Sequence, residues 1–518
     1  MKMNLYYPPY PVQIFEGESL PVNPARPLTP KSTLPTLASG IRFYAAQMGF
    51  NIDFEIIDLQ LGGELTFYKQ FMYGPRKMNC FQLGTPYEKI NSKILTADIH
   101  GITSNHTNAA QTVADLVKHI KMLAPDSLVI VGGTDATARP YYYIKNGADV
   151  VVKGEGEYVN SLVIQSYINN GKKFDNIPNI CTKNNMFDLN IDYSHLVDIN
   201  QMPVMSLDLI EDISIYTDTA EGPVPEGVNP NFICWETSRG CAWSCSFCTS
   251  ASRGTYRTLT PDTVKRHFEY FKKNGVKNIV WQEDNPLSRI QKNGKGEYIR
   301  KNGRKELLEI FKLAREYGFS WEFANGIEFC KFATEDGIDY ELLDHLLWND
   351  RSGNDWKGCY RVQIPLDNLA LEIKPRFPKL LTFERQLDVL KAMLTYSGMI
   401  HQTYDLFIGY PEQDSEVIDR FTNACLTIKD TLSSIDNNYV PYFNVFNLAL
   451  LPGSHDYHRY CRKLAFDIDE NPEVIGIFMS AMDTEYYSYY ELYQKRLEMS
   501  KILNDDDFIK RYDGTYTI

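Results

Sequence analysis

Strand-like and helix-like segments alternate along the second half of the chain, and this alternation constrains the fold more than any other feature of the sequence. The strand-like segments are residues 233–238, 278–282, 320–325, 360–365, 402–408 and 442–451. The segments between them have apolar residues at helical spacing, and they are residues 261–274, 304–317, 340–349, 383–397 and 415–432. Six strands separated by helices predict a full or partial parallel α/β barrel, with its chemistry at the carboxyl ends of the strands.

The first third of the chain predicts an α/β fold of the doubly wound, Rossmann type. Its strand-like segments and one helical segment are residues 54–59, 94–103, 112–123, 127–131 and 148–152. Glycines follow two of these strands, at Gly132, Gly133, Gly154 and Gly156. In such sheets ligands bind outside the carboxyl ends of the strands, so we expect a ligand near these glycines.

The composition suggests how the 518 residues divide. A Gly- and Pro-rich stretch at 218–231 can hold neither a strand nor a helix, and we interpret it as a linker or surface crossover. The predicted regions are an α/β domain at 1–200, a linker at 201–230, the barrel at 231–455 and a helical region at 456–518. The last region is rich in Tyr, which indicates a packing and capping element or, alternatively, a substrate lid.

Charge and hydropathy exclude several classes of function. Lys and Arg total 53 against 66 Asp and Glu, a net charge of −13, and no basic block could follow a phosphate backbone. We therefore expect no nucleic-acid partner. No apolar run approaches the ~18 residues of a membrane span, and Pro8, Pro9 and Pro11 stand where a signal peptide needs a helix. We expect a cytoplasmic protein.

Three of the ten cysteines, Cys241, Cys245 and Cys248, form a C-x3-C-x2-C motif after the first predicted barrel strand. Ten cysteines are too sparse for a disulfide framework in a chain of this length. Three thiolates on one loop can hold three irons of a cubane cluster and leave the fourth iron open. The alternative is a structural zinc site with Cys234 or a distant His as fourth ligand. Zinc sites favour paired C-x2-C units, and no second pair is present.

The motif, its aromatic Phe247 and its place after the first barrel strand resemble the radical S-adenosylmethionine (SAM) enzymes, over roughly residues 230–455. Later landmarks also match in order: an acidic turn at 280–285, a strand end at 358–368 and turns at 406–412 and 451–454. The strand end departs from the family, because Asp-Asn replaces the usual Glu-Ser. The SAM contacts that the resemblance implies are Phe247, Glu283, Asp284, Asp367, Gly409 and Pro411.

The resemblance implies a mechanism. The three cysteines would be the metal ligands of a 4Fe-4S cluster, whose open iron binds the amino and carboxylate groups of SAM. One electron, from a donor such as flavodoxin or ferredoxin, cleaves SAM to a 5′-deoxyadenosyl radical that abstracts hydrogen from an unactivated carbon. The cofactors perform this chemistry, and the barrel orients them.

Residues 97–103, 129–140 and 149–157 look like the cobalamin-binding domain that precedes many radical SAM barrels. The cobalamin contacts implied are Gly101, Thr103, Gly132, Gly133, Thr134, Gly154, Glu155 and Gly156. Proteins that bind cobalt through histidine carry Asp-x-His-x-x-Gly, whereas here Asp98 and His100 are followed by Thr103 at the last position. We interpret His100 as no cobalt ligand. The alternatives are a rearranged loop, or a domain that kept the fold and lost the cofactor.

These features together predict a cobalamin-dependent radical SAM enzyme. The first hypothesis is a methyltransferase acting on an unactivated carbon of a small-molecule or peptide natural product. The second is a radical SAM enzyme that cyclises, rearranges, oxidises or epimerises its substrate or transfers another SAM fragment, with or without cobalamin. The third is a non-catalytic protein with a structural cysteine site.

Overall fold

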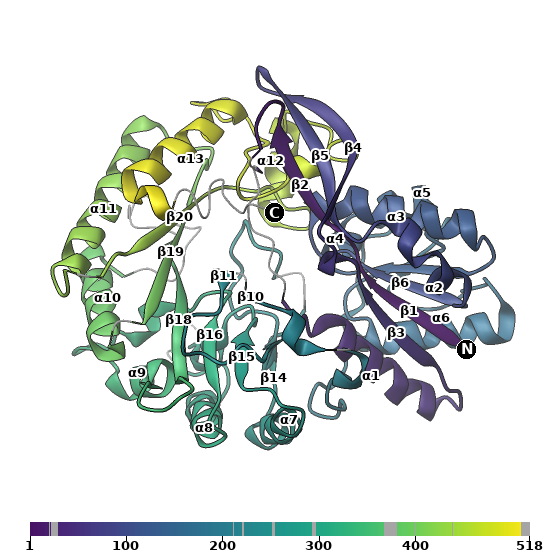
Figure 1. Cartoon of the computed structure of the whole chain (residues 1–518), viewed down its shortest axis with the longest axis horizontal. Coiled ribbons are helices and arrows are strands. Elements are labelled where there is room, and N and C mark those ends of the chain that lie inside the picture. The colour runs from purple at the N-terminus through teal and green to yellow at the C-terminus, as the bar shows by residue number, and fades with distance from the viewer. Residues whose placement is uncertain are drawn as a thin grey trace.

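The computed structural model describes residues 1–19, 21, 29–210, 212–219, 222–250, 254–292, 297–366, 381–398, 400–437 and 439–508. Two large sheets lie side by side, one built from the first part of the chain and one, strongly curved, from the second part (Figure 1). Among the described residues, no helix combines the length and the apolar character that a membrane crossing requires.

The first sheet has six strands in the order β3-β1-β6-β7-β8-β9. Their bounds are β1 Lys2–Tyr7, β3 Asp53–Asp58, β6 Ile99–Thr103, β7 Leu128–Gly132, β8 Val150–Val152 and β9 Ile180–Cys181. All neighbours are parallel except β8 and β9. The order reverses between β1 and β6, and a ligand crevice forms at such a point in doubly wound sheets.

Helices cover both faces of this sheet because its central strands are apolar on both sides. Ile130 of β7 packs with α1 (Thr33–Gln47) and α6 (Glu157–Asn170). Its neighbours Val129 and Val131 pack on the opposite face. The helices of that face are α2 (Asn91–Leu95), α3 (Ala110–Leu123) and α5 (Pro140–Lys145), and a short α4 (Thr134–Ala138) follows β7. The doubly wound prediction is confirmed.

The second sheet runs in chain order, β12-β15-β16-β18-β19-β20, with all neighbours parallel. The strands are β12 Phe232–Trp235, β15 Asn278–Trp281, β16 Ser320–Phe323, β18 Lys357–Pro365, β19 His401–Ile408 and β20 Tyr442–Asn447. The helices outside it are α7 Pro261–Lys273, α8 Gly303–Glu316, α9 Tyr340–Leu347, α10 Phe383–Ser397, α11 Ser415–Ser433 and α13 Tyr489–Leu503. Between the described β12 and β20 the barrel stays open. The predicted partial barrel is confirmed.

A third, antiparallel sheet was not predicted. It consists of β2 (Tyr10–Phe15), β5 (Arg76–Gly84) and β4 (Glu64–Tyr73), and it packs against the C-terminal region, beside α12 (His455–Tyr460) in Figure 1. Tyr73 donates a hydrogen bond to the Ser480 carbonyl (2.7 Å), and its ring lies against Tyr489 and Tyr493. The tyrosines therefore serve as packing elements. The Gly74-Pro75 turn, after a run with four aromatic residues, was the available signal for this hairpin.

The linker prediction needs one correction. Residues in the stretch expected to hold no strand form a short antiparallel pair, β10 (Asp218–Thr219) and β11 (Gly222–Pro223). Thr219 is buried and accepts a hydrogen bond from Arg361 of β18 (3.0 Å). Tertiary contacts bury Thr219 of this pair, and local propensity could not show that.

Candidate functional site

The cysteine loop starts and ends at one small β-ladder. Beyond β12, β13 (Ser238–Arg239) pairs antiparallel with β14 (Arg257–Thr258), and the three cysteines lie between them. Cys245 is buried, whereas Cys241 and Cys248 are partly accessible. The Cys248 amide donates to the Cys245 carbonyl (3.1 Å), which forms a tight turn between these two ligands.

Two serines support the outer thiols. Ser288 Oγ lies 3.6 Å from Cys241 Sγ and accepts the Ala242 amide (3.2 Å). The Ser250 amide donates to Cys248 Sγ (3.4 Å), and the Ser250 hydroxyl donates to Asp284 Oδ1 (2.8 Å). Donors directed at sulfur stabilise thiolates and tune clusters bound to them. Ser250 also connects a cysteine to the predicted SAM residue Asp284.

Trp243, between the first two cysteines, is attached to the barrel by a hydrogen bond. Its indole N–H donates to Glu328 Oε2 (2.8 Å), which also accepts from Asn285 Nδ2 (2.9 Å). Glu328 is buried, so these donors compensate a carboxylate that has lost its hydration. The bond to Glu328 therefore fixes the orientation of the indole.

Glu283 and Asp284 are adjacent but occupy different environments. Glu283 is buried, and its carboxylate accepts the Thr237 amide (3.2 Å), the Thr237 hydroxyl (2.5 Å) and the Ser238 hydroxyl. These bonds fix the chain just before the cysteine loop. Asp284 is only partly buried. Of the two predicted contacts, Glu283 points into the protein.

Of the remaining predicted SAM residues, Gly409 and Pro411 lie in the turn after β19, and Phe247 lies in the cysteine loop. Asp367 is outside the described residues. Gly409 has φ +92°, a left-handed conformation that favours glycine. Its amide donates to Gln413 Oε1 (2.8 Å), which holds the turn that contains Pro411. The Phe247 ring lies 5.9 Å from that of Phe407, so the cysteine loop packs against this strand.

A charge cluster joins the cysteine loop to the first sheet. Arg239, two residues before Cys241, pairs with Glu157 (2.7 Å), Glu155 (3.3 Å) and Glu236 (3.0 Å). Arg257, from the other end of the loop, pairs with Glu155 through both guanidinium nitrogens. Burial works to lower the pKa of Arg239, but the nearby carboxylates of Glu157, Glu236 and Glu155 outweigh it and raise the pKa. Glu155, predicted as a cobalamin contact, is therefore also a junction residue.

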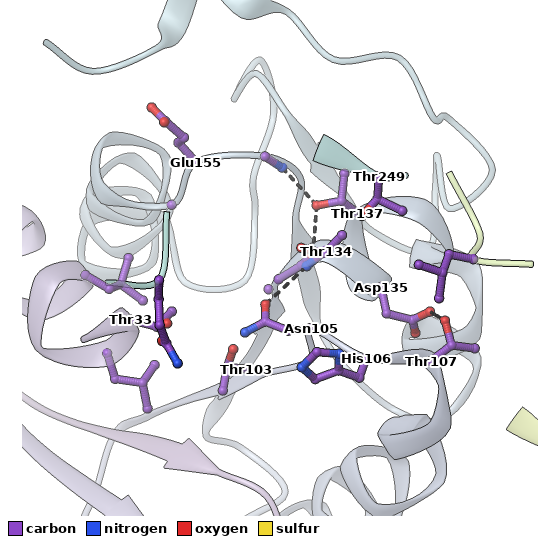
Figure 2. Close-up of a pocket in the computed structure, with 18 of the residues that line it drawn as sticks. Thr33, Thr103, Asn105, His106, Thr107, Thr134, Asp135, Thr137, Glu155 and Thr249 are labelled. Atoms are coloured by element: carbon purple, nitrogen blue, oxygen red, sulfur yellow. Dashed lines mark hydrogen bonds between the residues drawn. The ribbon is translucent and has the colours of Figure 1, made fainter. Parts of the chain in front are cut away.

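A cavity of about 900 Å³ lies where these parts meet. All eight predicted cobalamin residues line it: Gly101, Thr103, Gly132, Gly133, Thr134, Gly154, Glu155 and Gly156. Figure 2 shows Thr103, Thr134 and Glu155 around its edge. The cysteine loop contributes Arg239, Gly240 and Thr249. None of the described SAM residues or cysteines lines it.

The glycines of this cavity serve different purposes. A Cβ on Gly132 would have the Val152 carbonyl as nearest neighbour at 3.8 Å, so its absence leaves space open in the cavity. A Cβ on Gly133, at φ +117°, would lie 2.5 Å from the Ser104 carbonyl oxygen. A Cβ on Gly101 would collide with Leu5 and Met3 (2.7 Å each). Of these three glycines, only Gly132 leaves space towards the cavity, whereas Gly133 and Gly101 make room for protein atoms.

His100 is a core residue of β6. It is fully buried, its Nδ1 lies 2.9 Å from the Tyr6 hydroxyl, and it does not line the cavity. Burial lowers the pKa of this imidazole to about 4. A histidine within a buried strand cannot reach a ligand at the strand's end, which agrees with the interpretation that His100 is no cobalt ligand.

Sequence reasoning missed several cavity residues. The barrel mouth contributes four carboxamides, and the C-terminal region contributes a further segment: Gln282, Asn325, Gln363, Asn444 and residues 475–479. The positions of Gln282 directly after β15 and of Asn325 two residues after β16 were a usable signal. Nothing in the sequence pattern indicates that residues 475–479 return to this place. The loop after β6 also contributes His106.

The zinc alternative finds no geometric support. Within the part of the chain that the structure describes, no three His, Cys, Asp or Glu side chains gather closely enough for one metal ion. A cubane is a different case, because each of its irons takes its own thiolate. Cys234 is buried in β12, where burial raises the pKa of its thiol.

Comparison with known proteins assigns the barrel. Residues 235–421 match the radical SAM superfamily, so the chain contains a radical SAM domain, as the cysteine motif predicts. Uncharacterized methyltransferase PH0819 of Pyrococcus horikoshii is 24% identical over 339 residues, 62% of each chain. Cytidylyl-2-hydroxyethylphosphonate methyltransferase of Streptomyces wedmorensis is 23% identical over 61% of this chain and 58% of its own. This chain thus spans less than two thirds of the length of these relatives.

Solved structures confirm the two-part fold. The cobalamin-dependent S-adenosylmethionine radical enzyme OxsB superposes with a TM-score of 0.63 at 13% identity, over 95% of this chain and 65% of its own. The radical S-adenosylmethionine methyltransferase TsrM from Kitasatospora setae gives 0.61 at 14% identity, over 98% and 90%. The first was solved with aqua-cobalamin and SAM bound and the second with cobalamin and a [4Fe-4S] cluster.

Proposed function

We propose that this chain is a cobalamin-dependent radical SAM methyltransferase that acts on an unactivated carbon of a small-molecule or peptide natural product. One observation carries the proposal: a single cavity of about 900 Å³ is bordered by the start of the cysteine loop and by the carboxyl ends of the first sheet. Two cofactors held at these two borders would face the same space. The methyltransferase names of both relatives favour methyl transfer over the other radical SAM reactions.

The cysteine loop fits a 4Fe-4S cluster. Cys241, Cys245 and Cys248 would hold it, with Ser288 and the Ser250 amide beside two of the sulfurs. Glu283 and Glu328 hold the loop from inside the barrel through Thr237 and Trp243.

The SAM contacts we retain are Asp284, Phe247, Gly409, Pro411 and Asp367. Asp284 is linked through Ser250 to Cys248 and is only partly buried, which supports a role for its carboxylate in binding the ammonium group of SAM. Glu283 we reassign as a positioning residue, because Thr237 and Ser238 already donate to both of its oxygens.

The first sheet fits cobalamin. The cavity is large, and the space beside Gly132 admits a flat ligand close to the end of β7. When bound, the cluster, SAM and cobalamin supply the electron, the radical and the methyl group. The chain's own residues orient these groups and exclude water. The ion pair between Glu155 and Arg239 (3.3 Å) joins the two loops that would hold these cofactors.

Three further parts of the proposal concern the context of the reaction. The chemistry requires a one-electron donor, and we propose a protein such as flavodoxin or ferredoxin. The protein works in the cytoplasm, since cluster thiolates need a reducing compartment. We divide the chain into a cobalamin-binding domain at 1–200, a linker at 201–230, the radical SAM barrel at 231–455 and a C-terminal region at 456–518.

The proposal is tested by anaerobic purification with iron, sulfide and hydroxocobalamin, followed by metal counts and an assay with SAM and a strong reductant. We expect about one cobalt and about four irons per chain, with 5′-deoxyadenosine and S-adenosylhomocysteine both formed. Iron and 5′-deoxyadenosine without cobalt or S-adenosylhomocysteine would instead support a non-methylating radical SAM reaction. Redox-silent protein with zinc would contradict both.

A further inference from the structure

The loop that follows β6 presents two consecutive side chains to the cavity. Asn105 and His106 are exposed and line it, whereas Ser104 and Thr107 on either side are buried. Figure 2 shows the His106 ring next to Asn105 and Thr107, on the same side of the cavity as Thr103. The loop leaves the sheet beside the reversal of strand order between β1 and β6, where doubly wound sheets bind their ligands.

Buried hydrogen bonds fix both ends of this loop. The Ser104 amide donates to the Gly132 carbonyl (2.7 Å), and the Ser104 carbonyl accepts the Asp135 amide (3.1 Å). The Thr107 hydroxyl donates to Asp135 Oδ1 (2.5 Å). Asp135 is itself paired with buried Arg139 (2.9 Å). Since both anchors are buried, the two-residue tip is held in place before any ligand arrives.

The two tip residues have different tasks. Asn105 Oδ1 accepts the Thr134 amide (3.3 Å), so this side chain closes the loop onto the start of α4. His106 brings an imidazole, the commonest metal-binding side chain in proteins. It lines the same cavity as Thr103 and Gly132, the strand ends near which the proposed cofactor would lie.

A second histidine, His195, lines the same cavity but is arranged differently. Its Nε2 lies 3.3 Å from Asp192, and its ring stacks on Tyr158 with 6.2 Å between centroids. It follows no strand of the first sheet directly, since it belongs to a short 3-10 turn at Tyr193–His195. His195 therefore serves as a matched control.

We propose that His106 binds the cobalt of cobalamin from the side of the sheet. The inference rests on the proposed function, because it requires bound cobalamin. His106 would take the place of the histidine of the Asp-x-His-x-x-Gly pattern, which His100 cannot supply from within the core. The neutral imidazole donates a nitrogen lone pair to cobalt and displaces water or the cofactor's own benzimidazole base. No electron is transferred and no proton is released in this exchange.

Electron paramagnetic resonance tests this directly. The full chain, uniformly labelled with ¹⁵N, is loaded with unlabelled hydroxocobalamin, its cobalt is counted, and the cofactor is reduced to the Co(II) state. A histidine ligand then splits each axial line into a doublet, whereas the unlabelled benzimidazole base splits it into a triplet. We expect the doublet in the wild-type chain and in His195→Ala, and its loss in His106→Ala.

The outcomes separate the two proposals. A triplet, no splitting, or a doublet that persists in His106→Ala overturns the assignment of His106 while leaving cobalamin binding intact. Failure of the wild-type chain to retain cobalt overturns the proposed function, and the assignment of His106 with it. The isotope comparison in the wild-type chain decides the presence of a histidine ligand even where a variant is unstable.

Discussion

The two sides of the cavity are built in opposite ways. On the first sheet, the predicted ligand contacts are mostly glycines and threonines at strand ends, and the space beside Gly132 is set by the backbone. On the barrel, the cysteine loop carries side chains that are individually supported, such as Cys241 by Ser288 and Trp243 by Glu328. In the proposed function the strand ends of the first sheet shape the space around a ligand, with His106 as the proposed bonding side chain, whereas the cysteine loop offers three sulfur atoms as ligands.

This difference explains what each side tolerates. Replacing a side chain that binds a metal removes the bond itself. Replacing a small residue in a cavity wall instead fills space that the ligand needs. The Glu155 and Arg239 pair lies where the two sides meet. Four experiments therefore test the difference between the two sides of the cavity. They remove the cysteine ligands, break the ion pairs at the junction, fill the space beside Gly132 and titrate the buried His100.

The largest effect is expected from the cysteines. Replacing Cys241, Cys245 and Cys248 together by Ala removes the thiolates, so iron falls from about four per chain to near zero and SAM cleavage is lost. We expect the cobalt content to stay at the wild-type level, because we propose that the first sheet, and not the cysteine loop, binds cobalamin. Metal analysis of both elements checks this, with Cys461→Ser as control. Retention of iron by the triple variant would contradict the cluster assignment.

Breaking the junction comes next. Arg239→Met leaves the carboxylates of Glu155, Glu157 and Glu236 without their shared partner. We expect the free energy of unfolding to fall by about 3 kcal/mol. Denaturant unfolding measures this. The exposed pair of Arg42 and Asp208 (3.1 Å) provides the control, since Arg42→Met should cost no more than about 1 kcal/mol. Equal losses in the two variants would argue against a special junction.

Filling the space is expected to act on one cofactor alone. Gly132→Val places a branched side chain in the open space beside the end of β7, and we expect cobalamin affinity to fall about 100-fold, or about 2.7 kcal/mol. Iron content and SAM cleavage remain. Gly63→Val is the matched control, because a Cβ there meets nothing within 4 Å and Gly63 does not line the cavity. An unchanged affinity for cobalamin in the Gly132→Val variant would contradict a cobalamin site beside Gly132.

The smallest effect is expected on the pH dependence of stability, and it tests whether His100 is a buried core residue. Its pKa is lowered to about 4 from 6.5 by burial, so the unfolded chain binds the proton more readily once the pH falls below 6.5. Stability that is complete above pH 6.5 therefore declines towards pH 4, by about 2 kcal/mol at pH 5. His100→Gln should remove this part of the pH dependence of unfolding. An unaltered profile would mean that His100 is not the buried base seen here.

Much of the fold was predictable because its signals are local. The apolar segments of the barrel strands and the amphipathic helices between them follow from periodicity, and predicted and observed bounds differ by a few residues in most elements. The hairpin β4–β5 was missed because its stability comes from Tyr73, Phe15 and the C-terminal region, which meet only in the folded chain. The pair β10–β11 was missed for the same reason.

The site divides along the same line. The three cysteines and the strand-end glycines were recognisable from spacing and order alone. The role of Glu283 was not, because its partner Thr237 lies 46 residues away in sequence. Glu155 was predicted to touch a cofactor, yet its pairing with Arg239 and Arg257 depends on how the sheet and the barrel meet.

The sequence by itself determined the two α/β patterns, the thiol motif and the class of cofactor chemistry, since each depends on residues that are neighbours in one loop or periodic in one element. Only the tertiary structure decided that His100 is buried while His106 faces the cavity, and that residues 475–479 complete its wall. The physical reason is that a cavity is defined by surfaces from separate elements. Their relative positions are set by packing between residues hundreds of positions apart, which no local pattern records.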